Sequence, residues 1–576
     1  MKTLQAVDYV IITGYFVIMM AIGLYCLRYA RRVRNYFTGN NQVPWWLAGI
    51  SFYMTSFSAF TFVGYSEIAY RYGWVAVTLF WMPIGACLVA ALVFAPRWRR
   101  ARVMSPVELI ELRYNGALRQ VFAWAGIPLR MVDNGLRVYA TAIFVSIGMG
   151  FDIKVSIVAC GLVVLLYTFL GGLWAVTVTD FVQFLVLVVA VIVFVPFALG
   201  RVGGIEGFIA GAPQGFFQPV NPPYTWLYIL SFLALLILNY NAGWSLAQRY
   251  YCVRDERDAR KVGLMVAVLQ VFSPPIFFIP AMVARQVLPE LMTPPNKPEY
   301  CYAALAMLVL PAGLVGLMVA AMFSATMSTL SAEYNVLSSV LTNDVYHRLI
   351  DRHASERRLI WVARLATLVV GLLTMGVGFI VMLSPETTLF SKMVTVFGVV
   401  APALMIPVLA GFLTRRVTWR GALAGLLAGL ASGVSLYLYK VYFLSSATPA
   451  GKQWLTQVYE PMMIFIDCGV TIAGIVIASL LERRTAADEQ QINEFFARLE
   501  RHVLEDAPVA TDEPALSPFR LIGLVVMLIG AMLVAASFFS AAQWLNLGVG
   551  LAIVGIGYLF YRAHRRPPVV KESVPA

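Results

Sequence analysis

Residues 171–183 read GGLWAVTVTDFVQ, and they place one acidic residue, Asp180, near the start of a long apolar run. A charged side chain at the centre of a bilayer costs about 2.5 to 3.5 kcal/mol even on lenient scales, so such an acid usually faces a polar cavity or pairs with a cation. Alternatively, Asp180 lies near the lipid headgroups as a helix-start residue, because carboxylates are favoured at helix N-termini. In both interpretations, the stretch begins a helix that enters a membrane.

The composition predicts an all-α integral membrane protein with many crossings. Of the 576 residues, 60% are hydrophobic and 13% are charged, and many apolar runs reach the roughly 20 residues that one crossing needs. The net charge of +13 comes from arginines clustered between these runs, so it indicates orientation and no nucleic-acid partner. The six cysteines are scattered without paired spacing, so we expect neither a disulfide framework nor a zinc site. The first run follows Met1 closely and lacks a basic leader, which predicts a retained helix.

Fifteen apolar runs are long enough to be transmembrane helices. The expected helices lie near residues 7–27, 45–67, 74–95, 120–149, 155–173, 176–200, 225–250, 260–287, 301–345, 358–382, 388–413, 420–441, 461–481, 518–539 and 545–562. The predicted helices 155–173 and 176–200 are separated by only a short gap near Gly171-Gly172. Removing a crossing there would move every later basic cluster to the other side of the membrane.

The basic clusters predict a cell (inner) membrane protein with its N-terminus outside and its C-terminus in the cytoplasm. In the fifteen-helix layout they share one side, at residues 28–34, 97–102, 254–261, 348–358, 415–420, 483–484 and 562–566. Opposite loops such as 201–224 and 442–460 carry few basic residues, as the positive-inside rule requires.

Two polar segments interrupt the apolar runs, an outer stretch at 294–298 and an inner run at 482–517. The inner run places apolar residues on one helical face: Ile492, Phe495, Phe496, Leu499 and Val503. This face predicts packing beneath the helices or, alternatively, a helix on the membrane surface.

Hydroxyl side chains cluster in the second expected helix, at Ser51, Thr55, Ser56, Ser58 and Thr61. They either allow close packing and bond back to the preceding turn, or fill an unwound stretch whose carbonyls line a polar site. Their density favours the unwound stretch. A matching interruption, Asn239-Tyr240-Asn241-Ala242-Gly243, occurs five helices later. Paired broken helices at this offset predict an inverted repeat with a binding site between its halves.

A third polar cluster, ATMSTLS at residues 325–331, lies in the long ninth run. Its hydroxyls at Ser328 and Thr329 either bond back to carbonyls one turn earlier or join exposed carbonyls around a hard cation such as sodium. A hard cation needs several oxygen ligands, which neutral hydroxyls and carbonyls supply while letting the ion leave again.

At these residues the chain resembles the sodium/solute symporter family, whose members include sodium-coupled transporters of sugars, proline, iodide, pantothenate, monocarboxylates and sialic acid. The resemblance covers roughly residues 5–480. It rests on residues 171–183, 325–331, 342–346 (TNDVY), 248–249 (QR) and 105–108 (SPVE). Residues 64–73 also look like the segment that closes the first broken helix in the iodide and monocarboxylate branch.

The resemblance implies a leucine-transporter-like fold, a five-plus-five inverted repeat with one preceding and four following helices. The expected units are 1–43 (first helix and basic loop), 44–201 (first repeat), 202–415 (second repeat), 416–482 (two helices), 483–517 (cytoplasmic linker) and 518–576 (two helices and a basic tail).

The resemblance also implies a site for Na+ as the coupling ion. Its ligands would be the backbone carbonyls of Met54, Phe57 and Ala325 and the side chains of Ser328 and Thr329.

Some members of the family have a further sodium site, built from a carboxylate that matches Asp180 and hydroxyls that match Ser331 and the next position. Here the next position is Ala332, so one ligand of this second site is missing.

Substrate residues follow from the sialic-acid branch, where three hydroxyls of the first broken helix touch the substrate. They match Ser56, Ser58 and Thr61. That branch also has an arginine in the third core helix that meets a carboxylate. Arg137 lies in the comparable helix and is either this substrate ligand or the partner of Asp133 in an i, i+4 ion pair.

Asn239 and Tyr240 complete the predicted substrate site, with Tyr240 as a gate. The pocket pattern of the sugar transporters is largely absent around residues 239–244, which disfavours a neutral hexose. We therefore predict a sodium-coupled symporter that imports a small organic solute by alternating access, with a carboxylate-bearing solute such as sialic acid or a monocarboxylate favoured. Alternatives are a sodium/sugar or sodium/amino-acid symporter and a membrane sensor without transport.

An enzyme is not expected, because the four histidines fall in cytoplasmic segments and no metal spacing or serine-nucleophile motif occurs. The expected partners are the solute, sodium and the lipid bilayer, without an obligate protein partner.

Overall fold

The structure is a computed structural model, and it describes residues 4–26, 33–171, 173–293, 297–383, 388–446, 448–503, 518–540 and 542–563. Several predicted features lie partly outside these residues: the gap at Gly172, the polar stretch at 294–298, the linker at 483–517, and the basic clusters at 28–34 and 562–566.

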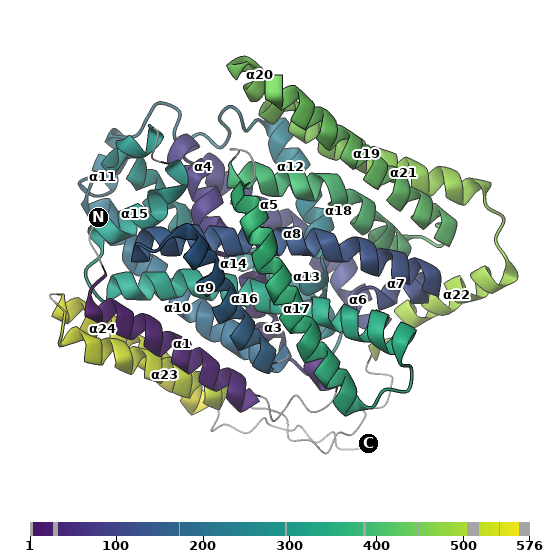
Figure 1. Cartoon of the computed structure of the whole chain (residues 1–576), viewed down its shortest axis with the longest axis horizontal. Coiled ribbons are helices and arrows are strands. Elements are labelled where there is room, and N and C mark those ends of the chain that lie inside the picture. Colours follow the sequence, from purple (N-terminus) through teal and green to yellow (C-terminus); the bar gives the residue numbers. More distant parts are fainter. Residues whose placement is uncertain are drawn as a thin grey trace, which may run out of the picture.

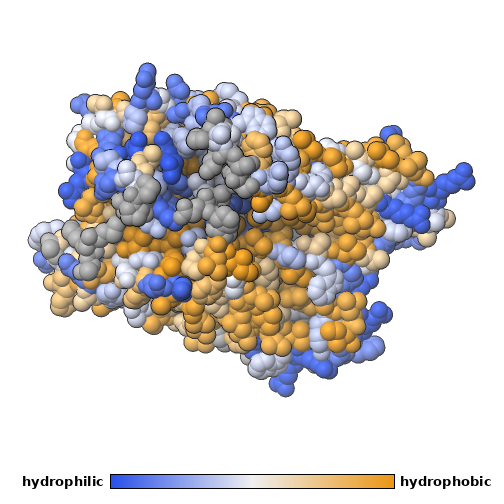
Figure 2. All heavy atoms as spheres, turned by 45° about the horizontal axis from the view of Figure 1, so that its top comes forward, coloured by the Kyte–Doolittle hydropathy of each residue, from blue (hydrophilic) through white to orange (hydrophobic). Residues whose placement is uncertain are grey.

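The described chain forms helices, with two isolated β-bridges and no strand in the described ranges. Eleven of the described helices are long and apolar enough to cross a membrane, or up to 13 spans if each of two bent helix pairs counts as one. Apolar residues cover the middle of the face in Figure 2, and hydrophilic residues gather towards its extremities. This distribution suits a multi-pass membrane protein.

The first 200 residues of the chain supply the helices α1 to α10 (Figure 1). Their bounds are α1 (Ala6–Cys26), α2 (Val33–Thr38), α3 (Trp45–Thr55), α4 (Ser66–Tyr72), α5 (Val75–Val89), α6 (Ala95–Ala101), α7 (Glu108–Arg113), α8 (Gly116–Met149), α9 (Ile153–Gly171) and α10 (Leu173–Gly200).

The remaining helices complete the bundle and its periphery. Their bounds are α11 (Gly204–Ala210), α12 (Trp226–Ala242), α13 (Trp244–Tyr251), α14 (Glu256–Val287), α15 (Cys301–Val309), α16 (Leu314–Ser339), α17 (Glu356–Leu383), α18 (Leu389–Leu413), α19 (Trp419–Ser446), α20 (Pro449–Trp454), α21 (Glu460–Leu481), α22 (Ala486–Glu500), α23 (Pro518–Ser537) and α24 (Gln543–Ala563).

Both predicted helix interruptions are present. The helix α3 ends at Thr55, and helical structure resumes as a π-helical turn, η3 (Thr61–Tyr65), that leads into α4. The chain also bends by 51° between α12 and α13, at Gly243. A Cβ atom at Gly243 would lie 2.4 Å from the carbonyl oxygen of Asn239, so the bend requires a residue without a side chain.

The prediction of one continuous helix over 301–345 is wrong. The helix α15 ends at Val309, and α16 begins at Leu314 after a turn in which Gly313 has a φ of +90°. Proline lacks the amide hydrogen that would continue the helix at Pro311. The Asp8 carboxylate of α1 accepts hydrogen bonds from the amides of Gly313 and Gly316, at 2.7 and 2.8 Å, and so caps the new helix start.

The helix α16 forms the centre of the bundle. It continues into a π-helical segment, η7 (Val340–Ile350), and the most apolar stretch of this span is entirely buried. Small side chains along residues 320–332 allow α3, α8, α9, α10 and α17 to pack around it. The polar residues of α16 therefore face other helices.

The peripheral helices cover the two flanks of this bundle. The helices α19 and α21 pack together against α18, and α23 and α24 pack together beside α1 and α10 (Figure 1). The helix α22 buries Ile492, Phe495 and Leu499 and contacts α6 and α7. This contact confirms the prediction that the amphipathic segment packs beneath the other helices.

Candidate functional site

Thr329 of α16 faces the break after α3 and contacts three backbone carbonyls. Its hydroxyl oxygen lies 2.5 Å from the carbonyl oxygen of Phe57, 3.1 Å from that of Ala325 and 3.3 Å from that of Met54. Met54 is in the last turn of α3, where carbonyls lack partners within the helix. The structure thus brings together four of the five residues predicted for the sodium site.

The carbonyl oxygens of Met54, Phe57 and Ala325 converge on a single hydroxyl group. A threonine hydroxyl donates one hydrogen, so Thr329 can satisfy only one carbonyl at a time. Ser328 is fully buried, and its hydroxyl interacts with the carboxylate of Asp180. A cluster of neutral hydroxyl and carbonyl oxygens is the donor set that a hard cation prefers.

Acidic and metal-ligating side chains do not form an alternative metal centre here. Within the residues that the structure describes, no three His, Cys, Asp or Glu side chains gather as a metal site. The hydroxyl and carbonyl oxygens around Thr329 are the ligands that hard cations prefer, whereas transition metals usually bind imidazole and thiolate.

A cavity of about 710 Å³ of space between atoms, partly open to solvent, lies beside the break after α3. All six predicted substrate residues line it: Ser56, Ser58, Thr61, Arg137, Asn239 and Tyr240. They come from the break after α3, from α8 and from α12, so tertiary packing converges on the paired helix interruptions.

Much of the cavity wall is apolar, and no sequence pattern predicted which residues form it. Sequence reasoning assigned no role to several lining residues of α12 and α18: Phe232, Leu235, Leu236, Met393 and Phe397. Apolar side chains at helical spacing look the same whether they face a cavity or a packed core. Only the folded structure separates the two.

Arg137 takes part in an ion pair and also lines the cavity. Its Nη2 lies 3.1 Å from the Oδ2 of Asp133, and both residues line the cavity. The Arg137 Nε is buried and has no hydrogen-bond partner among the described residues. The geometry therefore accommodates both predicted roles, since the guanidinium retains a donor after pairing with Asp133.

Thr326 of α16 connects α8, which lines the cavity, to the break after α3. The hydroxyl oxygens of Thr141 in α8 and Thr326 in α16 lie 2.7 Å apart. Thr326 also accepts a hydrogen bond of 3.0 Å from the amide of Ala59, in the break after α3. Sequence reasoning gave Thr326 no role, and membership of the hydroxyl cluster was its only signal.

Asp180 is fully buried in α10 and pairs with a cation, as one of the two initial interpretations required. Its carboxylate accepts a short hydrogen bond from Ser51, and its Oδ2 lies 3.7 Å from the Nη2 of Arg249. Ser331, the other residue predicted for a second sodium, donates its hydroxyl to the carbonyl of Ser328 at 3.0 Å. The pair of Asp180 and Arg249 joins α10 to α13.

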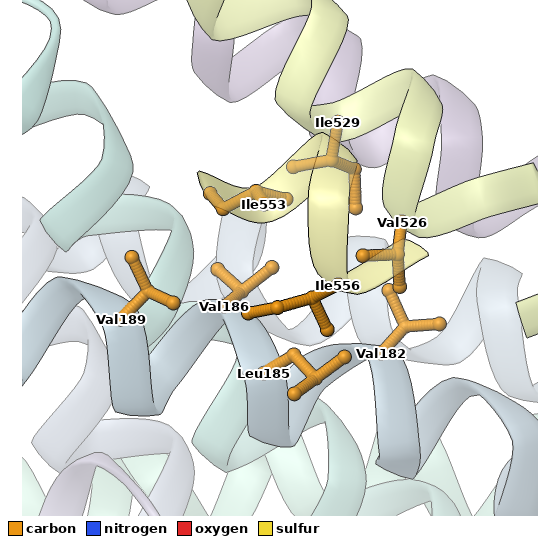
Figure 3. A pocket seen from close by; sticks show the side chains of 8 residues that line it. All are labelled: Val182, Leu185, Val186, Val189, Val526, Ile529, Ile553 and Ile556. Atoms are coloured by element: carbon orange, nitrogen blue, oxygen red, sulfur yellow. The ribbon is translucent and has the colours of Figure 1, made fainter. Parts of the chain in front are cut away.

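A second cavity has a different character. It lies between α10 and the C-terminal helices α23 and α24, and eight aliphatic side chains converge on it (Figure 3): Val182, Leu185, Val186, Val189, Val526, Ile529, Ile553 and Ile556. Without a polar group to orient a solute, this space is a packing seam rather than a candidate transport site.

Solved structures with the same architecture are transporters. A Na+-coupled sialic acid symporter, solved in a substrate-bound outward-open state, aligns with a TM-score of 0.70 at 21% identity over 83% of this chain and 98% of that chain. Mhp1, a nucleobase-cation-symport-1 family transporter, aligns with a TM-score of 0.50 at 12% identity over 80% of this chain and 98% of that one. The protein therefore has the fold of a leucine-transporter-like membrane transporter.

The chain belongs to the sodium:solute symporter family, because the profile of that family matches residues 36–429, more than half of its length. Similar proteins include the sodium/sialic acid symporter SiaT of Proteus mirabilis, 24% identical over 73% of this chain and 87% of the relative. Another is the sodium/mannose cotransporter SLC5A10 of Bos taurus, 28% identical over 78% of this chain and 81% of the relative. The predicted resemblance is confirmed, and family membership supports Na+ as the coupling ion.

Proposed function

We propose that this protein is a sodium-coupled symporter that imports a small organic solute by alternating access. The contact of the Thr329 hydroxyl with the carbonyls of Met54, Phe57 and Ala325 carries this proposal. Na+ would bind among these oxygens and the hydroxyl of Ser328. Its ligands come from α3 and α16, so the ion would stabilise the conformation in which the two helices are close.

The solute would bind in the cavity beside this site, in contact with Ser56, Ser58, Thr61, Asn239 and Tyr240. We propose a solute with a carboxylate, because Arg137 lines this region and its Nε has no hydrogen-bond partner among the described residues. Tyr240 would act as a gate. Sialic acid and short monocarboxylates fit this chemistry, and the relatives that carry sugars make a neutral hexose the main competing solute.

The driving force would come from the sodium gradient and the membrane potential. One charge that moves inward gains about 2.3 kcal/mol per 100 mV. This gain permits accumulation of solute with a single coupled ion. Asp180 and Ser331 stay a prediction for a second sodium position.

We further propose that all fifteen predicted helices cross the membrane, in the five-plus-five layout with units 1–43, 44–201, 202–415, 416–482, 483–517 and 518–576. Two observations support this layout. The helix interruptions after α3 and after α12 are five predicted helices apart, as an inverted repeat requires. In addition, α8 turns by 117° into α9. The 34 residues of α8 are about 51 Å long at 1.5 Å per residue, which is enough for one crossing without α9.

We place the protein in the cell membrane with its N-terminus outside and its C-terminus in the cytoplasm. The basic side chains near α6, α7 and α22 support this orientation, since positive residues are retained on the cytoplasmic side. The end of the bundle that carries α6, α7 and α22 is called the inner end below.

Uptake into proteoliposomes tests the proposal. Labelled sialic acid, short monocarboxylates, proline, pantothenate and hexoses are offered with and without a sodium gradient, to wild type and to Ser328→Ala, Thr329→Ala and Arg137→Ala. Two matched controls remove a hydroxyl elsewhere: Ser435→Ala in α19 and Thr168→Ala in α9, each of which bonds back to its own helix.

We expect carboxylate uptake in wild type that depends on sodium, is lost in Ser328→Ala and Thr329→Ala, and persists in both controls. Loss in Arg137→Ala supports a carboxylate contact. Sodium-independent uptake that survives Ser328→Ala refutes the sodium site. Hexose uptake that Arg137→Ala leaves unchanged assigns that arginine to its pair with Asp133 alone, and a protein that moves no solute is better explained as a sensor.

A further inference from the structure

Asp180 already has a permanent cation beside it. Both Asp180 and Arg249 have fully buried side chains, and the Oδ2 of Asp180 lies 3.7 Å from the Nη2 of Arg249. Ser51 bridges them, because its hydroxyl donates to Asp180 and accepts from the Nε of Arg249 at 3.0 Å. The carboxylate and the guanidinium therefore neutralise each other inside the bundle.

The guanidinium of Arg249 is held by oxygens of the kinds that would otherwise surround a metal ion. Besides Ser51, it contacts the Gln248 Oε1 at 2.6 Å, the Ser245 carbonyl at 3.4 Å and the Thr55 hydroxyl at 3.4 Å. These groups belong to α3 and α13. An arginine with so many fixed partners stays charged and in place.

The other residues predicted to bind a second sodium either have a different partner or lack a ligand atom. The hydroxyl of Ser331 donates to the carbonyl of Ser328 at 3.0 Å, and position 332 is an alanine, which has no ligand atom. Ser328 interacts with the Asp180 carboxylate and has no other hydrogen-bond partner within the described residues. A sodium ion added beside Asp180 would meet a pair that is already neutral and a guanidinium of like charge.

We propose that Arg249 is a built-in cation that takes the place of a second sodium, so that each chain binds one sodium ion. The inference rests on the proposed function, and it specifies the ion stoichiometry of the same site. Asp180 and Arg249 then act as positioning residues for that ion. Asp180 orients the hydroxyl of Ser328, and Arg249 holds Ser51 and Thr55, which lie on either side of Met54 in the last turns of α3.

Equilibrium binding of radioactive sodium to the purified full chain in detergent tests this inference. We expect one ion per chain in wild type and none in Thr329→Ala. The neutral double variant Asp180→Asn/Arg249→Met keeps one ion, with sodium binding about tenfold weaker, because loss of an outer partner of a ligand usually costs 10- to 100-fold in metal affinity. Arg249→Lys keeps the charge and also binds one ion.

The number of sodium ions bound per wild-type chain tests this inference even if the variants fail to fold. Two ions per chain refute this inference and leave the proposed function intact, whereas no bound sodium refutes both. If the double variant loses its ion while Thr329→Ala retains one, the ion lies at Asp180, and Arg249 is not its replacement.

Discussion

Charged pairs hold helices together at the inner end of the bundle, and aromatic rings pack together towards the opposite end. At the inner end, Arg130 of α8 lies 3.3 Å from Glu333 of α16, and Ser245 of α13 donates to the same carboxylate. Nearer the surface, Arg119 pairs with Asp344.

At the other end, Phe390 of α18 is buried and packs against rings from three segments. Its ring centroid lies 5.0 Å from that of Tyr65, 5.7 Å from that of Phe232, 6.0 Å from that of Tyr224 and 6.5 Å from that of Tyr228. Ring contacts are worth about 0.5 to 1.5 kcal/mol each beyond their buried area and tolerate sliding. A buried charge without its partner is far more costly, so the two ends differ in what their opening requires.

The largest expected effect comes from breaking the central pair at the inner end. Glu333→Gln leaves Arg130 buried without a counter-charge, which should lower the free energy of unfolding by about 3 to 5 kcal/mol. Denaturant unfolding in detergent measures this loss. The double variant Arg130→Met/Glu333→Met should lose less than Glu333→Gln alone, and a larger loss in the double variant contradicts the importance of the unpaired charge.

A smaller effect is expected at the aromatic end. Phe390→Leu keeps an apolar side chain of similar size and removes the ring contacts, so the free energy of unfolding should fall by about 2 kcal/mol. The same unfolding measurement applies. Phe539→Leu is the matched control because Phe539 is 81% exposed, and equal losses in the two variants would show that the ring cluster around Phe390 adds nothing.

The rim of the inner end should respond to pH. Hydrogen bonds from Arg348, and then from Arg119, lower the pKa of Glu111 in α7 to about 2 from a usual value of 4.5. Because the pKa is lowered in the folded state, this stabilisation is present above about pH 4.5 and is lost as the pH falls towards 2.

Solvent screening limits this contribution to about 1 kcal/mol, since the Glu111 side chain is 30% exposed. Glu111→Gln should therefore reduce the loss of stability between pH 5 and pH 3, as followed by thermal unfolding in detergent. If wild type and variant lose stability in parallel over that range, Glu111 does not contribute to the pH response.

The smallest effect is expected for an exposed pair on the same side of the molecule. Arg415 lies 3.2 Å from Glu500 of α22, and both side chains are more than half exposed. Arg415→Ala should change the free energy of unfolding by less than about 1 kcal/mol. A loss as large as that of Glu333→Gln would mean that burial does not set the strength of the charges at this end.

Local sequence signals were sufficient for the residues near the helix breaks. Hydroxyls and glycines within apolar runs identified the break after α3 and the bend at Gly243, because backbone geometry depends on neighbouring residues. The same reasoning missed the division between α15 and α16, although Pro311 and Gly313 are visible in the sequence. Hydropathy alone merged these helices, since both are apolar.

Contacts between distant segments were not predictable in the same way. Asp180 and Arg249 are 69 positions apart, and no local pattern pairs them. Met393 and Phe397 line the cavity from α18, yet their spacing is that of any packed helix.

The sequence by itself determined a multi-pass helical membrane protein, the positions of its broken helices and a resemblance to one family of transporters, because hydropathy, turn residues and short motifs act over a few turns of chain. Tertiary structure alone decided which cation faces Asp180 and which apolar side chains enclose the cavity. These depend on how helices pack against one another, and a buried polar group takes whichever partner that packing brings within reach.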